Sequence, residues 1–343
     1  MCVTEQTNVP TPEATSAFNV ESVRGAASPI AKKEHQKPSP GSSVIIRHWN
    51  DLSLLSPFHG DGSATTVSFR VSPKHLSLAS NVFRTMIQGP YKESIRNSCG
   101  LYEIQASEWD ARCFFIMLNI IHGHNRDVPK LVTLEKLKQM AIIVNYYLCH
   151  EVVAFVVDIR IARLSTKLPT QFGDDSITWM FISQVFSNRR IWTSMATMAV
   201  QNSSGIIETD LPIPLSTLEH INLERRKIID KLYNGLYDLV DRLLAGKEGC
   251  KAECSSMLLS SLLRQMHENG LRMDKLTNPW ERMSIADVKR VMLDFHSPVW
   301  YSSNHTYTPH QCTVENKIND LLSGQKYLIA WHFFPLPSTW TEG

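Results

Sequence analysis

Cysteine is sparse in this sequence, at seven residues in 343. Small secreted domains that depend on disulfides are far richer in cysteine, so we exclude a disulfide scaffold. No charged segment followed by an apolar run opens the sequence, as a secretory signal would. We therefore expect an intracellular protein of the cytoplasm or the nucleus.

Long hydrophobic runs are lacking too. A membrane span needs about twenty nearly uninterrupted apolar residues. The most apolar stretch, residues 140–159, is interrupted by polar and charged side chains, namely Asn145, His150, Glu151 and Asp158. We expect no membrane-spanning helix.

An excess of charge of one sign is also absent, because 35 Lys and Arg residues balance 33 Asp and Glu residues to a net charge of +2. Broad nucleic-acid binding needs many basic side chains on one face, so we expect no direct nucleic-acid binding. Phosphate-binding glycine loops, dinucleotide fingerprints, His-Glu-x-x-His and Gly-x-Ser-x-Gly are missing from the sequence. This favours a protein that is not an enzyme.

What is present is ample apolar material, 43% of the residues, enough for one large or two ordinary domains. The two ends differ from the rest. Residues 1–48 contain five prolines and few apolar residues, so we predict a disordered tail. Residues 326–343 are rich in aromatics without a clear period, and we expect an irregular tail.

Strand signals gather near the start of the apolar region. Residues 51–55 and 66–71 read as two strands of a hairpin, and residues 101–104 as a third strand. Ser72 followed by Pro73 is typical of a helix start, and we expect helical structure from there to Gly89.

Helical signals dominate the remainder. Residues 107–110 resemble a capping box for the next helix. Within residues 134–150, apolar side chains recur at the spacing of a helix. An apolar stripe follows two prolines and predicts a long packed helix, with a dimerising coiled coil as the alternative; it consists of Ile229, Leu232, Leu236, Leu239 and Leu243. Further helices are expected at residues 174–186, 191–200, 253–267, from Ser284 with Asp287 as its capping partner, and 313–324.

A fifteen-residue block joins a strand ending in Phe-x-Val to a helix with Leu five residues after the Val and then Ser and Phe. The residues at these positions are Phe69, Val71, Leu76, Ser80 and Phe83. The block resembles the signature of the BTB/POZ domain.

The resemblance covers residues 49–155, since Asp51 and its neighbours resemble the family's first strand and the later helices come in the family's order. The sequence of the chain is also similar to the sequences of a large group of filamentous-fungal BTB proteins with a helical C-terminal half. The resemblance implies an α+β fold, with a BTB/POZ-like small sheet covered by helices, followed by an all-α domain at residues 156–325.

By resemblance, the chain is a protein–protein interaction module that self-associates as a homodimer and acts as an adaptor or scaffold. Two alternatives are a transcription or chromatin-associated regulator and a substrate adaptor of a cullin ubiquitin ligase. Ser72 and Pro73 stand where the family usually has His and a basic residue, which argues against a charged corepressor pocket.

A cluster of thiols and imidazoles lies in the helical half. It contains Cys250 and Cys254, then His267, and finally His310 and Cys312. These side chains are preferred zinc ligands, and four of them, Cys250, Cys254, His310 and Cys312, form a candidate structural zinc site. The spacing is not that of a zinc finger, and plain buried cysteines are the alternative. A catalytic metal would need an open coordination position.

Two other pairs are weaker candidates. His122 and His124 flank a glycine and could share a metal, although a polar loop explains them as well. Cys149 and His150 are adjacent, and neighbouring helical side chains diverge by about 100 degrees, so they cannot face each other as nucleophile and base. We expect Cys149 to be a core residue.

Overall fold

The protein has a helix-rich α+β fold with three strands and eleven α-helices among the residues described. The chain divides into two units, Met1–Leu168 with Val185–Ser187, and Pro169–Gln184 with Asn188–Gly343. The domain boundary predicted at residues 155 and 156 falls inside a helix of the first unit. A computed structural model describes residues 16–21, 51–54, 66–107, 109–271, 282–300 and 310–323.

The first unit contains a three-stranded sheet in the order β2-β1-β3. The middle strand β1 (Ser16–Glu21) runs antiparallel to β2 (Thr66–Val71) and parallel to β3 (Tyr102–Ser107). The central strand therefore comes from residues 1–48, predicted as a tail. The rest of that segment, and the tail predicted at residues 326–343, lie outside the described residues.

Residues 51–54 form a short 3-10 helix, η1 (Asp51–Leu54), so the strand predicted there is wrong. The antiparallel partner of β2 is β1, and the predicted hairpin is wrong as well. A run this short fits a strand and a helical turn equally well, and here the turn buries Leu52.

Helix α3 (Ala111–Ile121) is the centre of the first unit, because all its residues from Cys113 to Ile121 are buried. Asp110 caps this helix by accepting a hydrogen bond from the backbone N–H of Cys113, at 2.9 Å. The capping box predicted at residues 107–110 is wrong, because Ser107 is the last residue of β3 and the helix is capped by Asp110 instead. Helix α3 is contacted by α1 (Pro73–Ala79), α4 (Leu134–Tyr147), α5 (His150–Leu164) and the 3-10 turn η3 (Asn125–Asp127). The first unit also contains α2 (Asn81–Gln88) and the 3-10 turns η2 (Lys92–Ser94) and η4 (Ser165–Lys167).

The helical structure predicted from Ser72 to Gly89 is broken once, at Ser80, whose backbone is extended. The Ser80 hydroxyl accepts from the Phe83 N–H at 3.1 Å and donates to the Tyr147 carbonyl. The Phe83 ring stacks on the Tyr147 ring at 4.3 Å. A serine hydroxyl that offers the backbone another partner favours the end of one helix and the start of the next.

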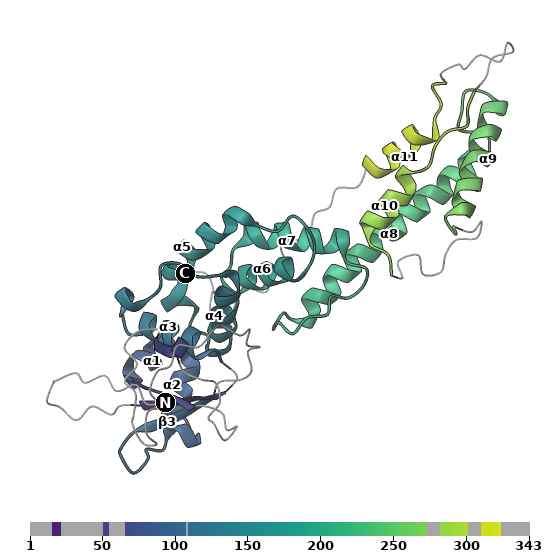
Figure 1. Ribbon diagram of the computed structural model, residues 1–343. Helices are drawn as coiled ribbons and strands as arrows, with labels where there is room; N and C mark the ends of the chain where they lie inside the picture. The colour runs from purple at the N-terminus through teal and green to yellow at the C-terminus, as the bar shows by residue number, and fades with distance from the viewer. Residues whose placement is uncertain are drawn as a thin grey trace. The chain divides into compact units, whose positions relative to one another are not determined.

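The second unit is helical in its described part (Figure 1). Its longest helix, α8 (Leu215–Leu244), contacts four others, α7, α9, α10 and α11. The five apolar residues of the predicted stripe are all buried on α8, as core packing requires. The remaining helices are α6 (Asp174–Val185), α7 (Arg189–Asn202), α9 (Ala252–Glu268), α10 (Ile285–Leu293) and α11 (Val314–Ser323).

The capping box predicted for Ser284 and Asp287 is confirmed at the start of α10, with both reciprocal hydrogen bonds present. Across residues 16–21, 51–54, 66–107, 109–271, 282–300 and 310–323, no helix has both the length and the apolar character needed to cross a membrane.

We predict that Ser80→Ala lowers the free energy of unfolding by about 2 kcal/mol, because it removes a helix cap and leaves the buried Tyr147 carbonyl without its donor. Urea denaturation followed by circular dichroism measures this change. Thr85→Ala on the same helix removes only an exposed hydrogen bond and should change stability by less than about 0.5 kcal/mol. Equal effects from both variants would contradict the role of Ser80.

Candidate metal centre

The loop between α8 and α9 carries the first cysteine of the predicted cluster. Gly246 and Gly249 have positive φ values of 64° and 94°, which let the chain turn back sharply. A Cβ on Gly249 would lie 3.0 Å from the Ser255 nitrogen and 3.3 Å from the Cys254 sulfur. Glycine is required here both by its backbone conformation and by this close approach.

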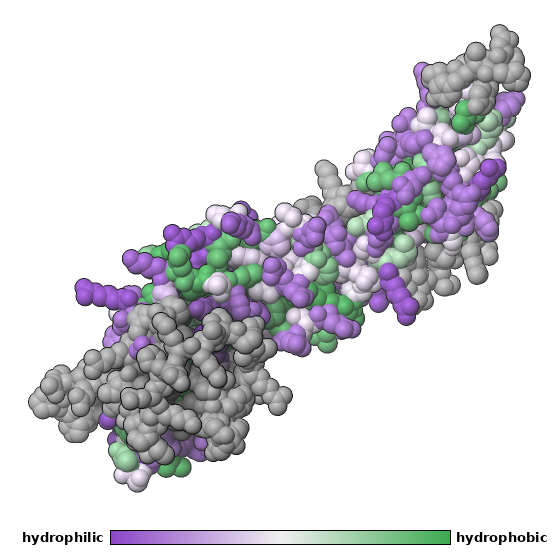
Figure 2. Space-filling model, in the orientation of Figure 1, coloured by the Kyte–Doolittle hydropathy of each residue, from purple (hydrophilic) through white to green (hydrophobic). Residues whose placement is uncertain are grey.

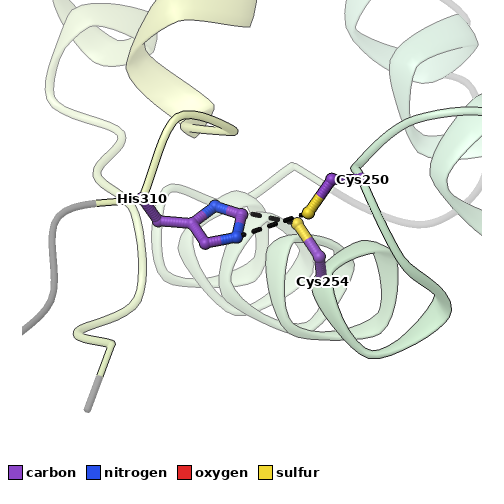
Figure 3. A group of neighbouring side chains, drawn as sticks. All are labelled: Cys250, Cys254 and His310. Atoms are coloured by element: carbon purple, nitrogen blue, oxygen red, sulfur yellow. Dashed lines mark hydrogen bonds between the residues drawn. The ribbon is translucent and has the colours of Figure 1, made fainter. Parts of the chain in front are cut away.

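Three of the four predicted ligands come together (Figure 3). Cys250 lies in the loop, Cys254 in the first turn of α9, and His310 in the segment before α11. Their ligand atoms all lie within 4.8 Å of one another. The sulfur of Cys250 is 3.5 Å from His310 Nε2, and the sulfur of Cys254 is 3.9 Å from His310 Nδ1.

The fourth predicted ligand, Cys312, is outside this three-residue group, but its thiol interacts with that of Cys254. Burial raises the pKa of Cys254 above its ordinary value, and the Cys312 and Cys250 thiols raise it further, because adjacent thiolates repel each other. A divalent cation would remove that repulsion and hold these sulfurs as thiolates.

The His310 ring is held from two sides. Trp300 stacks on it with ring centroids 4.2 Å apart, and Nδ1 lies 3.3 Å from the Cys312 carbonyl oxygen. Nδ1 also accepts a hydrogen bond from the Cys312 N–H, at 3.2 Å. The Cys312 backbone therefore holds the ring at Nδ1, and Nε2 lies on the side of the Cys250 sulfur.

An ion-pair network braces the loop beside the cluster. Glu248 accepts from Arg242 at 2.9 Å and from Lys317 on α11. Lys317, with Arg242, holds the pKa of Glu248 below its ordinary value. Ser255 also donates to the Leu243 carbonyl at 2.7 Å, so the start of α9 is tied to the end of α8.

The donor set and its spacing fit a tetrahedral metal ion. Zinc binds thiolate sulfur at about 2.3 Å and imidazole nitrogen at about 2.0 Å, so tetrahedral angles place the two donors about 3.5 Å apart. The Cys250 sulfur and His310 Nε2 are 3.5 Å apart. The group is a candidate metal site compatible with structural zinc.

His267 does not belong to this site. It lies thirteen residues beyond Cys254 on the same helix, which corresponds to about 20 Å along the axis. The thirteen-residue separation, visible in the sequence, is already too long for Cys254 and His267 of one helix to bind the same ion. Gly249, Glu248 and Lys317 were not singled out by sequence reasoning, because their roles depend on the loop conformation and on the packing of α11.

The BTB-signature residues lie mainly in the core of the first unit. Phe69, Leu76, Ser80 and Phe83 are buried, with at most 2% of each residue exposed. Val71 and Asp51 are partly exposed, at the end of β2 and the start of η1.

The two histidines around Gly123 lie in a turn after α3. His122 donates from Nδ1 to the Leu118 carbonyl at 2.8 Å and accepts at Nε2 from the Ser72 N–H at 3.0 Å. Both ring nitrogens of His122 therefore form hydrogen bonds with backbone groups. In the described ranges, neither His122 nor His124 joins a group of three metal-ligating residues.

Cys149 is fully buried, and its sulfur lies 3.7 Å from that of Met117. Burial raises its pKa to about 12, so the thiol stays neutral at ordinary pH. The expectation that Cys149 is a core residue is confirmed.

Comparison with protein-family models finds no match, and comparisons with curated proteins and with solved structures find none either.

We predict a pH dependence of stability from His150. Burial lowers the pKa of His150 below its ordinary 6.5, and neither ring nitrogen has a hydrogen-bond partner in the described part of the chain. The unfolded chain takes up a proton that the folded chain resists, so the free energy of unfolding should fall as pH drops below about 6.5. His150→Leu should flatten this decline in urea titrations between about pH 7.5 and 5.

The matched control for this prediction is the exposed His267, whose replacement by Gln should leave the decline as in the wild type. An unchanged decline in His150→Leu would show that other groups cause it.

Proposed function

We propose that the chain is a protein–protein interaction module whose first unit is a BTB/POZ-like domain that self-associates, and that it serves as an adaptor or scaffold. The observation that carries the proposal is the joint burial of Phe69, Leu76, Ser80 and Phe83 in one core. These side chains carry the resemblance to the BTB/POZ signature. They come from β2, α1, α2 and the break between the two helices, and Ser80 and Phe83 contact Tyr147 of α4.

The surface of the first unit supports the same proposal. Among the strands described, β2 and β3 are the outer ones of the sheet, and an outer strand is a possible site of pairing with another chain. Large apolar side chains are exposed as well, including Leu78 at 79% and Phe155 at 78%.

An experiment can separate the two more specific functions, a substrate adaptor of a cullin ubiquitin ligase and a transcription or chromatin-associated regulator. Affinity purification from native cells that recovers a cullin favours the ubiquitin-ligase adaptor, and recovery of chromatin proteins favours the regulator. Recovery of neither class leaves the general interaction module.

We also propose that the second unit holds one structural zinc ion through Cys250, Cys254, His310 and Cys312. The proximity of the Cys312 and Cys254 thiols supports a closed shell of three sulfurs and one nitrogen. Such a centre would fasten the α8–α9 loop to the segment before α11. A closed shell serves folding, whereas a catalytic zinc keeps one position open.

We predict about one zinc ion per chain in purified protein, measured by elemental analysis. Cys254→Ser should abolish stoichiometric binding, because this thiol is central to the cluster. Cys99→Ser, which changes an exposed cysteine of the first unit, should retain the metal. Cobalt substitution tests the fourth ligand, since Cys312→Ser should weaken the sulfur-to-cobalt charge-transfer absorption. Zinc-free wild-type protein would overturn the proposal.

We predict that the full chain shows a mass above 39.0 kDa in light scattering at tens of micromolar, and approaches that mass on dilution. Cys254→Ser should self-associate like the wild type, because the proposed interface belongs to the first unit. A strict monomer over the whole concentration range would contradict self-association.

A further inference from the structure

Helix α5 is apolar on two opposite faces. Val153, Val157 and Ile161 are buried in the first unit, with at most 3% of each residue exposed. On the other face, Phe155 is 78% exposed and Ile159 is 55% exposed. An amphipathic surface helix would carry polar residues on that face, and an apolar outer face is typical of a helix that is covered from both sides.

The outer face continues beyond these two residues. Val152 and Val156 are partly exposed, and they complete with Phe155 and Ile159 a row that we call the α5 outer row. Residues three and four apart are neighbours on a helix surface, so the row forms one stripe. Figure 2 shows hydrophobic residues at the surface in the region of α5, among hydrophilic ones.

Opposite charges stand at the two ends of the α5 outer row. Glu151 is exposed in the first turn of α5, and Arg163 is exposed in the last turn. Each is a multiple of four residues from Phe155 or Ile159, so both side chains lie close to the stripe.

We propose that the α5 outer row is the interface for a second copy of this chain, packed antiparallel about a twofold axis; this names the interface of the self-association proposed above and rests on it. Phe155 of one copy then faces Ile159 of the other, and Glu151 faces Arg163. A twofold axis makes each of these contacts twice.

The charge order selects the second copy as the occupant. An antiparallel pair places each Glu151 opposite an Arg163, whereas a parallel pair places like charges opposite each other. Antiparallel helices also align their dipoles favourably. The surface is thus complementary to itself in one orientation.

The contact is small, since four apolar side chains per copy form its centre. Interfaces of this size lie at the weak end of specific association, and we expect a dissociation constant on the order of micromolar. The exposed position of the row means that substitutions there leave the core of the first unit intact.

The first experiment is sedimentation velocity on the full chain with Phe155→Asp, which should raise the dissociation constant at least about tenfold because two carboxylates enter the apolar centre. Ile95→Asp is the matched control, since Ile95 is 72% exposed in the same unit but outside α5. It should bind like the wild type. Circular dichroism checks that both variants are folded.

The second experiment reverses the charges. Glu151→Arg alone and Arg163→Glu alone should each dimerise more weakly than the wild type, because like charges then face each other twice. An equimolar mixture of the two single variants should form a heterodimer of near wild-type affinity, since every introduced charge then faces an opposite one.

The outcomes separate the two proposals. A wild-type chain that stays monomeric overturns both the self-association and the interface. A wild-type dimer that Phe155→Asp leaves intact, or a mixture that fails to recover affinity, overturns the α5 interface and leaves self-association standing.

Discussion

The burial of helix α3 is the constraint on which the first unit depends. Nine consecutive residues of α3 are buried, so it must be surrounded, and β2, η1, α1, α4 and α5 all contact it. The Phe69 ring lies 6.0 Å from that of Phe114 on this helix, and Phe114 lies 5.9 Å from Tyr147. These aromatic contacts connect α3 to strand β2 and to helix α4.

The second unit depends in the same way on α8, and the position of the candidate metal centre follows from where α8 ends. Gly246 and Gly249 turn the chain back, Ser255 ties the next helix to α8, and Cys250 and Cys254 become neighbours. A metal ion at this place would add a long-range connection to the segment at His310.

Strongly periodic features could be predicted from the sequence. The α8 stripe and the Ser284–Asp287 capping box rest on local spacing, and local spacing is visible in a sequence. The errors involve short segments. Residues 51–54 are too few to show a period, and the place of β1 beside β2 depends on pairing over about fifty residues. The cap of α3 moved from Ser107 to Asp110 because β3 extends through Ser107.

The sequence by itself determined that this chain has two helix-rich parts with a small sheet in the first, and which four side chains could bind a metal, because residue chemistry and periodicity are local properties. Only the tertiary structure decided that Cys250, Cys254 and His310 meet, and that Phe155 lies outside while Val157 lies inside. These outcomes depend on how distant segments pack, since the helix period places a residue on a face and packing chooses which face is covered.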